Sequence, residues 1–565
     1  MTRALKQIGK FLEPALIFLN CHFTDYYLKS YWTTLIPPKL RQDLESKSLD
    51  QVKTCMIDLT TGKWREYSEI KDEIYNTDWN FDTVSSLEQL IVAVGKLKLA
   101  ELGLCTSYKK MEEKRNVLKQ RDSKLLVNLE FDNFMASKKM HEVMKFSEFI
   151  ACSCEGVNLS KDKVIGAEEN ARRIENIVDV GSGKGYLSSF LAMYYNIKVL
   201  AIDASASNTD GCEKRTAKLD KRWPQLVRRA KERRDHGTCA NLGRHWKKTL
   251  AKQGISVEEY VAEMAKDIQS GENNLKSVTE MITTKTDLQN LVSTNLGGGS
   301  DGAANMKYGI VGLHTCGNLG ANILKLFLHN ENANFICVVP CCYNLVREDE
   351  NLYKEDIYYG SKLGYGFGKT GPWPDGSIGF PLSTGLKEYD CGKPYVVGRN
   401  ARMLSAYSLP RMVESESGME MPPTLYYRGM LQVLLKRHNL ISSGSDSGAS
   451  DDSDMRVGRM TKPCSNFRDY VTFALNKLPV EASNILTDGS IEDVESTYAT
   501  PDLIDKFHKY YLLRAMFASV VEDLILLDRM VYLLEQESIA DANLIQLFNP
   551  ALSPRSHAIV AVKKS

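Results

Sequence analysis

Residues 174–192, IENIVDVGSGKGYLSSFLA, limit the possible folds of this chain more than any other segment. Their apolar start is typical of a buried strand, the glycines at alternate positions predict a tight turn, and the apolar run after them predicts a helix. A second apolar run, IKVLAID, follows at residues 197–203. Strand, turn, helix and strand in this order predict the start of a parallel sheet in an α/β fold.

Five further apolar runs extend the predicted sheet. Three of them are SVTEMITTKTDL, which ends near Asp287, YGIVGLHTCG at residues 308–317 and NFICVVPCCYN at residues 334–344. Two more, ANLIQLFNP and HAIVAVK, lie near the C-terminus, and the connection between them is short enough for an antiparallel pair. The pattern therefore predicts a seven-stranded, mostly parallel sheet that ends in a C-terminal antiparallel hairpin.

The segment before the sheet is predicted to be helical. In residues 1–130 we find no chemistry beyond packing. Residues 85–104 place apolar side chains at helical spacing, with Ser85 or Ser86 available as the N-cap. We interpret this region as a helical N-terminal part of the protein.

Two long segments interrupt the predicted α/β domain, which spans residues 131–565. The first is a basic insertion at residues 204–276, and the second covers residues 345–500. Within the second, residues 442–454 (SSGSDSGASDDSD) are polar and acidic, which predicts a disordered linker.

The glycine turn predicts a nucleoside site. Glycine at positions 181, 183 and 185 lets the backbone approach a ligand closely, and the N–H groups at the helix start can donate to it. Asp203 ends the next strand, where a carboxylate can accept hydrogen bonds from the hydroxyls of a ribose. A purely structural turn is the alternative.

The acid before the turn distinguishes between two cofactors. A dinucleotide site has the spacing G-x-G-x-x-G, whereas this chain has G-x-G-x-G preceded by Asp179. Asp179 would repel a pyrophosphate, but it can pair with the ammonium group of S-adenosylmethionine (SAM). The predicted SAM-binding residues are Asp179, Gly181, Ser182, Gly183, Gly185, Asp203 and Asp287. Asp287 would accept from the adenine amino group, or else is a solvated loop acid.

Several motifs together resemble the methyltransferase-like protein 25 family. They are SKKMHEV, DVGSGKGYLSSFLA, GLHTCGNL, CCYNL, GRNARM, LILLDRMVYLLEQE and SPRSHAIVAVK, in this order from about residue 130 to the C-terminus. The resemblance implies a SAM-dependent methyltransferase with a seven-stranded Rossmann-like sheet. The LHTCG and CCYN segments are also distantly similar to those of a tRNA 2′-O-methyltransferase family.

The methyl acceptor is expected beyond the ends of the fourth and fifth strands, because ligands of parallel sheets bind at the carboxyl ends of the strands. The candidate catalytic residues there are His314, Cys341, Tyr343 and Asn344. His314 is a candidate base, and Tyr343 and Asn344 are candidate orienting groups. Cys341 enters through an alternative, the covalent route by which some enzymes methylate pyrimidine carbon. A structural histidine is equally compatible with the sequence.

A metal is not expected at this position. His314, Cys316, Cys341 and Cys342 could supply four ligands to zinc. Adjacent cysteines rarely chelate one tetrahedral ion, however, and the common ligand spacing is wider.

Two polar segments could lie near the site. SKKMHEV contributes Lys138, Lys139, His141 and Glu142. GRNARM places Arg399 and Arg402 three residues apart, where they could hold a phosphate or carboxylate. In both segments, salt-bridged or solvated helices are the alternative.

The acceptor class is predicted from charge. The chain has net charge +1, yet residues 213–252 contain 14 Lys or Arg against four Asp or Glu, with Trp223 and Trp246 among them. A basic stripe steers polyanions, and aromatic rings stack on bases. RNA is therefore the favoured acceptor and protein the second, and a catalytically silent interaction module is the alternative to an enzyme. The sequence leaves the oligomeric state open.

The location is predicted from cysteine usage and hydropathy. The 13 cysteines form no CxxC pair, which favours reduced thiols inside a cell, in the cytoplasm or nucleus. No apolar run reaches the roughly 18 residues of a membrane span. A mitochondrial transit peptide is the less favoured interpretation of the basic N-terminus.

Overall fold

The computed structural model describes most of the chain: residues 1–67, 80–121, 135–156, 174–236, 274–297, 306–349, 376–415, 417–440, 464–478, 485 and 489–564. The chain divides into two compact units. Unit 1 comprises residues 1–103, 342–372 and 380–531, and unit 2 comprises residues 104–341, 373–379 and 532–565.

This division differs from the predicted one. Residues 380–531, most of which the sequence suggested as an insertion into the α/β domain, pack with the N-terminal helices instead. Asn20 Nδ2, for example, donates to the carbonyl of Val397 (2.8 Å), and the Tyr395 hydroxyl donates to the carbonyl of Gly9 (2.9 Å). The proposed linker at 442–454 lies outside the described residues.

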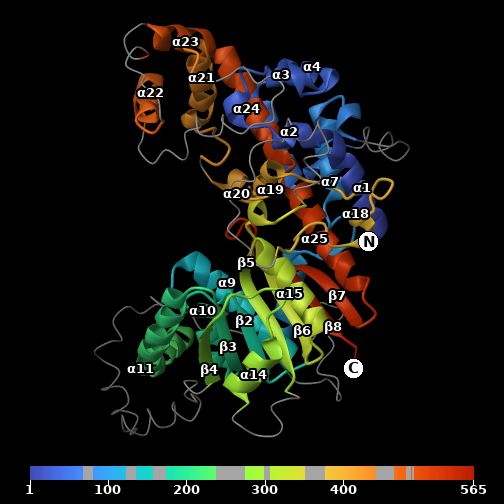
Figure 1. Cartoon of the computed structure of the whole chain (residues 1–565), viewed down its shortest axis with the longest axis vertical. Coiled ribbons are helices and arrows are strands. Elements are labelled where there is room, and N and C mark those ends of the chain that lie inside the picture. Colours follow the sequence, from blue (N-terminus) through green and yellow to red (C-terminus); the bar gives the residue numbers. More distant parts are fainter. Residues whose placement is uncertain are drawn as a thin grey trace. The chain divides into compact units, whose positions relative to one another are not determined.

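Unit 2 is built on an eight-stranded sheet, one strand more than predicted. The strands are β1 (Cys105–Thr106), β2 (Asn176–Val180), β3 (Lys198–Asp203), β4 (Leu275–Thr279), β5 (Tyr308–Cys316), β6 (Ala333–Cys341), β7 (Ile539–Gln546) and β8 (His557–Lys563). Their order is β1-β7-β8-β6-β5-β2-β3-β4 (Figure 1). The additional strand, β1, is a two-residue parallel pairing with β7, too short to leave an apolar pattern in the sequence.

The centre of the sheet contains a change of direction. β2 pairs in parallel with both β3 and β5. The chain runs outward from β2 to β3 and β4, then returns to the other side of β2 to form β5 and β6. β8 lies between β6 and β7 and is antiparallel to both. In open α/β sheets, ligands bind where the strand order reverses, which here is at the carboxyl ends of β2 and β5.

Helices cover the sheet. They are α8 (Tyr108–Arg121), α9 (Ser137–Cys154), α10 (Tyr186–Tyr195), α11 (Ala206–His236), α14 (Leu288–Leu296) and α15 (Asn318–His329). Phe146 and Phe149 of α9 and Leu191 of α10 pack with Ile177 and Val311 of the sheet in one buried apolar cluster. Burying such side chains contributes roughly 1.5–3 kcal/mol each, so the cluster holds β2 and β5 firmly.

Unit 1 is helical. Its helices include α1 (Thr2–Leu12), α2 (Leu16–Asn20), α3 (Tyr31–Thr34), α4 (Pro38–Ser46), α5 (Leu49–Thr61), α7 (Leu87–Leu97), α18 (Thr384–Lys387), α19 (Arg399–Leu404), α20 (Leu409–Glu414), α21 (Pro423–Arg437), α22 (Phe467–Leu475), α23 (Ser490–Tyr498), α24 (Pro501–Met516) and α25 (Ala518–Leu534). α7 begins after Ser86, whose hydroxyl accepts from the N–H of Gln89, so the predicted N-cap is confirmed.

Aromatic side chains bring distant segments of unit 1 together. Tyr510 of α24 contacts Phe18 edge-on, with ring centroids 5.0 Å apart, and Phe507 lies 4.4 Å from Tyr26. Aromatic pairs of this kind contribute about 0.5–1.5 kcal/mol beyond their buried area. Within the described residues, no helix combines the length and apolar character that crossing a bilayer requires.

Candidate functional site

The glycine turn after β2 is fixed by backbone hydrogen bonds to β3. The N–H groups of Gly181 and Ser182 both donate to the carbonyl of Ile202 in β3 (2.9 and 3.1 Å). Gly183 has φ +56°, and a Cβ added there would meet open space. At Gly185 (φ +65°) a Cβ would collide with the Cys212 side chain of α11. Gly183 thus leaves room for a ligand, whereas Gly185 lets α10 and α11 pack closely.

Asp179 is a buried carboxyl at the base of this turn. It is 1 % exposed, and the Ser188 hydroxyl of α10 donates to its Oδ2 (2.5 Å). Burial, with a further contribution from the negative charge of Asp203, raises the pKa of Asp179 to about 7. A carboxyl with this pKa is poised to ionise when a cation binds beside it.

Asp203 is held by the loop that follows β3. Its Oδ2 accepts from the N–H of Gly183 (2.8 Å), and its Oδ1 accepts from the N–H of Ser205 (2.9 Å) and from Asn208 Nδ2 (3.0 Å). A carboxylate has about four acceptor positions. Three are therefore used within the protein, and about one remains for a ribose hydroxyl.

The two other predicted cofactor residues have different surroundings. Ser182 Oγ is buried and has no hydrogen-bond partner among the described residues. Asp287 lies eight residues beyond the end of β4 at Thr279, because the third predicted strand is shorter than expected. Asp287 instead caps α14, and its Oδ1 accepts from the N–H of Asn290 (3.0 Å).

A histidine–glutamate pair lies at the end of β5. His314 has φ +67°, in the left-handed region, at a bulge in the pairing of β5 with β6. Its Nε2 lies 3.1 Å from Oε2 of Glu142 in α9, and the Ser553 hydroxyl donates to the other carboxylate oxygen (2.6 Å). Burial alone would raise the pKa of Glu142, but the hydrogen bonds from His314 and Ser553 outweigh it and lower the pKa. Glu142 is therefore an ionised acceptor that orients the imidazole.

This pair extends the predicted site. His314 was predicted as a base, but its contact with Glu142 was not, and Ser553 was part of the SPRSHAIVAVK motif without a role being assigned to it. The SKKMHEV segment that carries Glu142 was singled out in the sequence, and its neighbour His141 accepts at Nε2 from the N–H of Asn549 (3.2 Å). Both side chains thus connect α9 to the segment between β7 and β8.

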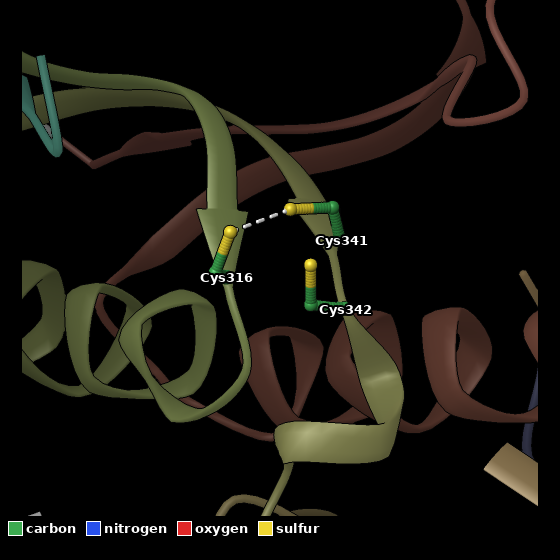
Figure 2. Close-up of side chains that lie close together, drawn as sticks. All are labelled: Cys316, Cys341 and Cys342. Carbon is green, nitrogen blue, oxygen red and sulfur yellow. Dashed lines mark hydrogen bonds between the residues drawn. The ribbon is translucent and has the colours of Figure 1, made fainter. Parts of the chain in front are cut away.

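Three cysteine thiols lie together at the ends of β5 and β6 (Figure 2). Cys316 and Cys341 are paired in register, and their Sγ atoms are 3.0 Å apart. The Sγ of Cys342 lies with them, all three within 4.8 Å of one another. Cys316 is exposed, Cys341 is buried and Cys342 is intermediate.

The other residues predicted for the acceptor site lie in unit 1. Tyr343 is buried there, and its hydroxyl donates to Oε1 of Glu522 (3.2 Å). Asn344 follows it in the short helical turn Tyr343–Leu345. The structure thus brings His314, Cys316 and Cys341 together within unit 2, and gives the Tyr343 hydroxyl a partner inside unit 1.

The structure decides between the alternatives for Arg402, and it contradicts the stacking role predicted for Trp223. Arg402 is 1 % exposed, forms an ion pair with buried Glu348 and donates from Nε to the carbonyl of Tyr343 (3.0 Å), so the salt-bridged alternative is confirmed for this residue. Trp223 is 3 % exposed and packs edge-on against Phe190, so it does not present a stacking surface. Trp246 lies outside the described residues.

Comparisons with known proteins agree with this arrangement. Residues 138–349, which carry α9, the glycine turn, His314 and the cysteine cluster, match a family model described as a methyltransferase domain. The chain is 28% identical to the human protein named probable methyltransferase-like protein 25, over 99% of this chain and 96% of the relative. The mouse protein of the same name is 27% identical over the same shares. No solved structure matches.

The match to the family model starts at Lys138 and ends at Asp349, so it includes Glu142 as well as the predicted cofactor turn. The two relatives extend the similarity through unit 1, of which the family model matches residues 342–349. Residues 138–349 therefore resemble a methyltransferase domain, and the predicted resemblance to the methyltransferase-like protein 25 family is confirmed along nearly the whole length of the chain.

Proposed function

We propose that this chain is a SAM-dependent methyltransferase that acts on RNA. The observation that carries the proposal is the buried carboxyl of Asp179 beneath an open glycine turn, at the point where the strand order reverses. A pyrophosphate would be repelled by this carboxyl, whereas an ammonium group would be stabilised by it.

The side chains around the turn fit SAM. Asp179 would hold the ammonium group, and Asp203 would accept from a ribose hydroxyl with its remaining acceptor position. The unpartnered Ser182 Oγ supplies one more polar contact, and Gly183 leaves the space that a ligand needs. When bound, SAM supplies a methyl group on a positively charged sulfur, which a nucleophile can attack in line.

His314 is the proposed general base. Its Nε2 faces ionised Glu142, which favours the tautomer with the proton on Nε2 and leaves Nδ1 as the acceptor. The side chain is 35 % exposed, so an incoming hydroxyl or amine can reach it. His314 would take the proton of the acceptor during transfer, and Glu142 would stabilise the imidazolium that results.

The start of α11 supports RNA as the acceptor. Lys214, Lys218, Lys221 and Arg222 are all exposed and follow the i, i+4, i+7, i+8 spacing of one helix face. Cys212, Leu219 and Trp223 are buried on the opposite side. Asn208, in the first turn of the same helix, contacts Asp203, so the helix that carries the basic face starts beside the proposed cofactor site.

The acceptor class is tested by incubating the full-length protein with tritiated SAM and cell extract. Treatment of the product with nuclease or with protease before counting then separates the two classes. Label released by nuclease alone supports the proposal, and label released by protease alone would make protein the acceptor. SAM binding without transfer to either fraction would favour a catalytically silent interaction module.

Substitution of Asp203 tests the cofactor site. Asp203→Ala removes a charged acceptor, and hydrogen bonds to charged groups contribute about 1.5–3 kcal/mol. We expect the Kd for SAM in calorimetry to rise about 10- to 150-fold. Asn208→Ala is the control, because it removes one internal partner of Asp203 and leaves the carboxylate. Equal SAM affinity in Asp203→Ala and the unmodified protein would refute the assignment.

Charge reversal on α11 tests the RNA interface. The triple variant Lys214→Glu, Lys218→Glu, Lys221→Glu should weaken RNA binding about 10-fold or more. It should also reduce the salt dependence of binding, because fewer phosphate contacts release fewer counterions. Its affinity for SAM should not change.

The matched control makes the same charge change on exposed lysines of unit 1, at Lys39, Lys393 and Lys436. Filter binding at several salt concentrations measures both variants. An equal loss in the two would mean that net charge, rather than the α11 face, governs RNA binding.

A further inference from the structure

Three thiols, those of Cys316, Cys341 and Cys342, form a cluster at the ends of β5 and β6. Cys316 and Cys341 are register partners on neighbouring parallel strands, so both side chains project from the same face of the sheet. The N–H of Gly317 donates to the carbonyl of Cys341 (3.0 Å), which ties the two strand ends together. The first two thiols are therefore held in place by the sheet itself.

The third thiol is brought in by an unusual backbone conformation. Cys342 has φ +50° and ψ +50°, the left-handed conformation that non-glycine residues rarely adopt and that costs about 1 kcal/mol or more. In an extended strand, successive side chains point to opposite faces. The left-handed turn instead places the Cys342 sulfur beside those of Cys341 and Cys316 (Figure 2).

Adjacent cysteines rarely bind one metal ion, because in a regular strand their side chains point to opposite faces. Cys342 follows the end of β6 and has a left-handed backbone conformation, so this restriction does not apply to it. Cys341 and Cys342 are joined by one peptide bond, so the local backbone sets their relative position although the division into compact units runs between them.

The backbone before the cluster is also strained. His314, two residues before Cys316, has φ +67°, which a non-glycine residue rarely adopts, whereas Gly317 after it adopts φ +55° without strain. The Cys316 thiol also lies 3.4 Å from the carbonyl of His314 and donates to it. Strained residues of this kind persist where the surrounding structure fixes them, and they concentrate at functional sites.

We propose that Cys316, Cys341 and Cys342 bind one thiophilic metal ion, Zn²⁺, as three thiolates. Thiolate ligands without carboxylates select soft or borderline metals over Mg²⁺ or Ca²⁺. Zinc with sulfur ligands at about 2.3 Å requires sulfur–sulfur separations of roughly 3.8 Å. The observed separations, from 3.0 Å up to at most 4.8 Å, bracket this value.

Three protein ligands leave one of the four positions of zinc for water or another ligand, an arrangement found in zinc sites that take part in chemistry. Cys316 and Cys341 are the last residues of β5 and β6, and Cys316 is two residues from His314. The inference goes beyond the proposed methyl transfer and does not depend on it, because metal binding can be measured without SAM or an acceptor.

The experiment measures metal content and thiolate coordination in the full chain purified under reducing conditions. We expect about one Zn²⁺ per chain by elemental analysis. Replacement by Cd²⁺ should give the ultraviolet charge-transfer absorption of thiolate–cadmium bonds. Cys316→Ser and Cys342→Ser should each weaken Zn²⁺ binding about 10-fold or more in competition with a chromophoric chelator, and should reduce the cadmium absorption.

The control is Cys391→Ser, which removes an exposed thiol of unit 1 and should change neither readout. Cys316 is exposed, so its substitution is expected to leave the fold intact, which circular dichroism checks; Cys341→Ser is then not needed for the decision. Protein that binds no Zn²⁺ even when the ion is added would overturn the proposal. So would Zn²⁺ binding that is equal in all variants, or a Cys316–Cys341 disulfide found by mass spectrometry in the freshly isolated protein.

Discussion

Asp179→Asn is expected to abolish tight SAM binding while leaving the fold intact. The amide has nearly the same shape and can still accept from Ser188, but it lacks the charge that would pair with an ammonium group. Removing one partner of a buried charge pair costs about 2–5 kcal/mol, so the Kd for SAM should rise between roughly 30-fold and several thousand-fold. Isothermal titration calorimetry measures the change.

The pH dependence of SAM binding gives a second measure of the same carboxyl. Because the pKa of Asp179 is about 7 in the protein without ligand, SAM must bind to a group that is partly protonated at neutral pH. Binding should strengthen as the pH rises from 6 to 8 and should release a proton, which calorimetry detects in buffers of different ionisation enthalpy. Asp179→Asn should lose this pH dependence.

The stability of the protein without SAM should change in the opposite sense. The pKa of Asp179 is raised from 3.8 to about 7 on folding, so between these values the folded protein binds a proton that the unfolded chain does not. Stability therefore falls as the pH rises through this window, by at most about 4 kcal/mol, and is lowest above pH 7. Asp179→Asn lacks this titration, so its melting temperature should rise relative to that of the unmodified protein as the pH increases from 5 to 8.

Asp210→Asn serves as the control for both experiments, because Asp210 is an exposed acid on α11. It should alter neither SAM affinity nor the pH dependence of melting. If Asp179→Asn bound SAM as tightly as the unmodified protein at pH 8, the carboxyl would not contact the cofactor, and the charge argument for SAM over a dinucleotide would fail.

The geometry of the glycine turn could be predicted from the sequence because its signals are local. Gly181, Gly183 and Gly185 follow an apolar strand directly, and all three have positive φ, as their spacing implied. Asp179 and Asp203 are each placed by the strand that carries them. Local signals also gave the N-cap at Ser86.

The remaining parts of the site depend on contacts between distant segments. Glu142 and His314 are 172 residues apart, and Ser553 is 411 residues from Glu142. Neither separation leaves a periodic pattern. The same reason explains unit 1, where the segment around Val397 packs on the N-terminal helices although the sequence suggested an insertion elsewhere.

One error arose from residue type rather than from distance. Tryptophan in a basic segment suggested a stacking surface, but Trp223 falls on the apolar face of α11 and joins the core with Phe190. The argument from adjacent cysteines against a metal assumed a regular strand, and the left-handed conformation of Cys342 could not be predicted from residue type. One amino-acid sequence reveals the composition of a chain and the periodicity of its apolar residues, but it does not reveal which residue adopts a strained backbone conformation.

His314→Gly is expected to lower the rate of methyl transfer about 10²- to 10⁴-fold while leaving SAM affinity unchanged. Glycine adopts φ +67° without strain, so the bulge in β5 should be preserved and the loss should reflect the missing imidazole rather than misfolding. The substitution also leaves a space beside Glu142. Because the side chain it replaces is 35 % exposed, added imidazole can enter that space and should restore part of the activity.

Glu142 is expected to act through His314 as a positioning residue. Glu142→Gln retains an oxygen that can accept from Nε2 but loses the charge that stabilises the imidazolium, so kcat should fall with little change in the KM for SAM. The double variant with His314→Gly should be no slower than His314→Gly alone, because the two residues serve one proton transfer. Ser553→Ala is the matched control for lost packing around Glu142. If added imidazole fails to rescue His314→Gly and the two substitutions reduce activity independently, His314 is a structural residue of the bulge and the base must be sought elsewhere.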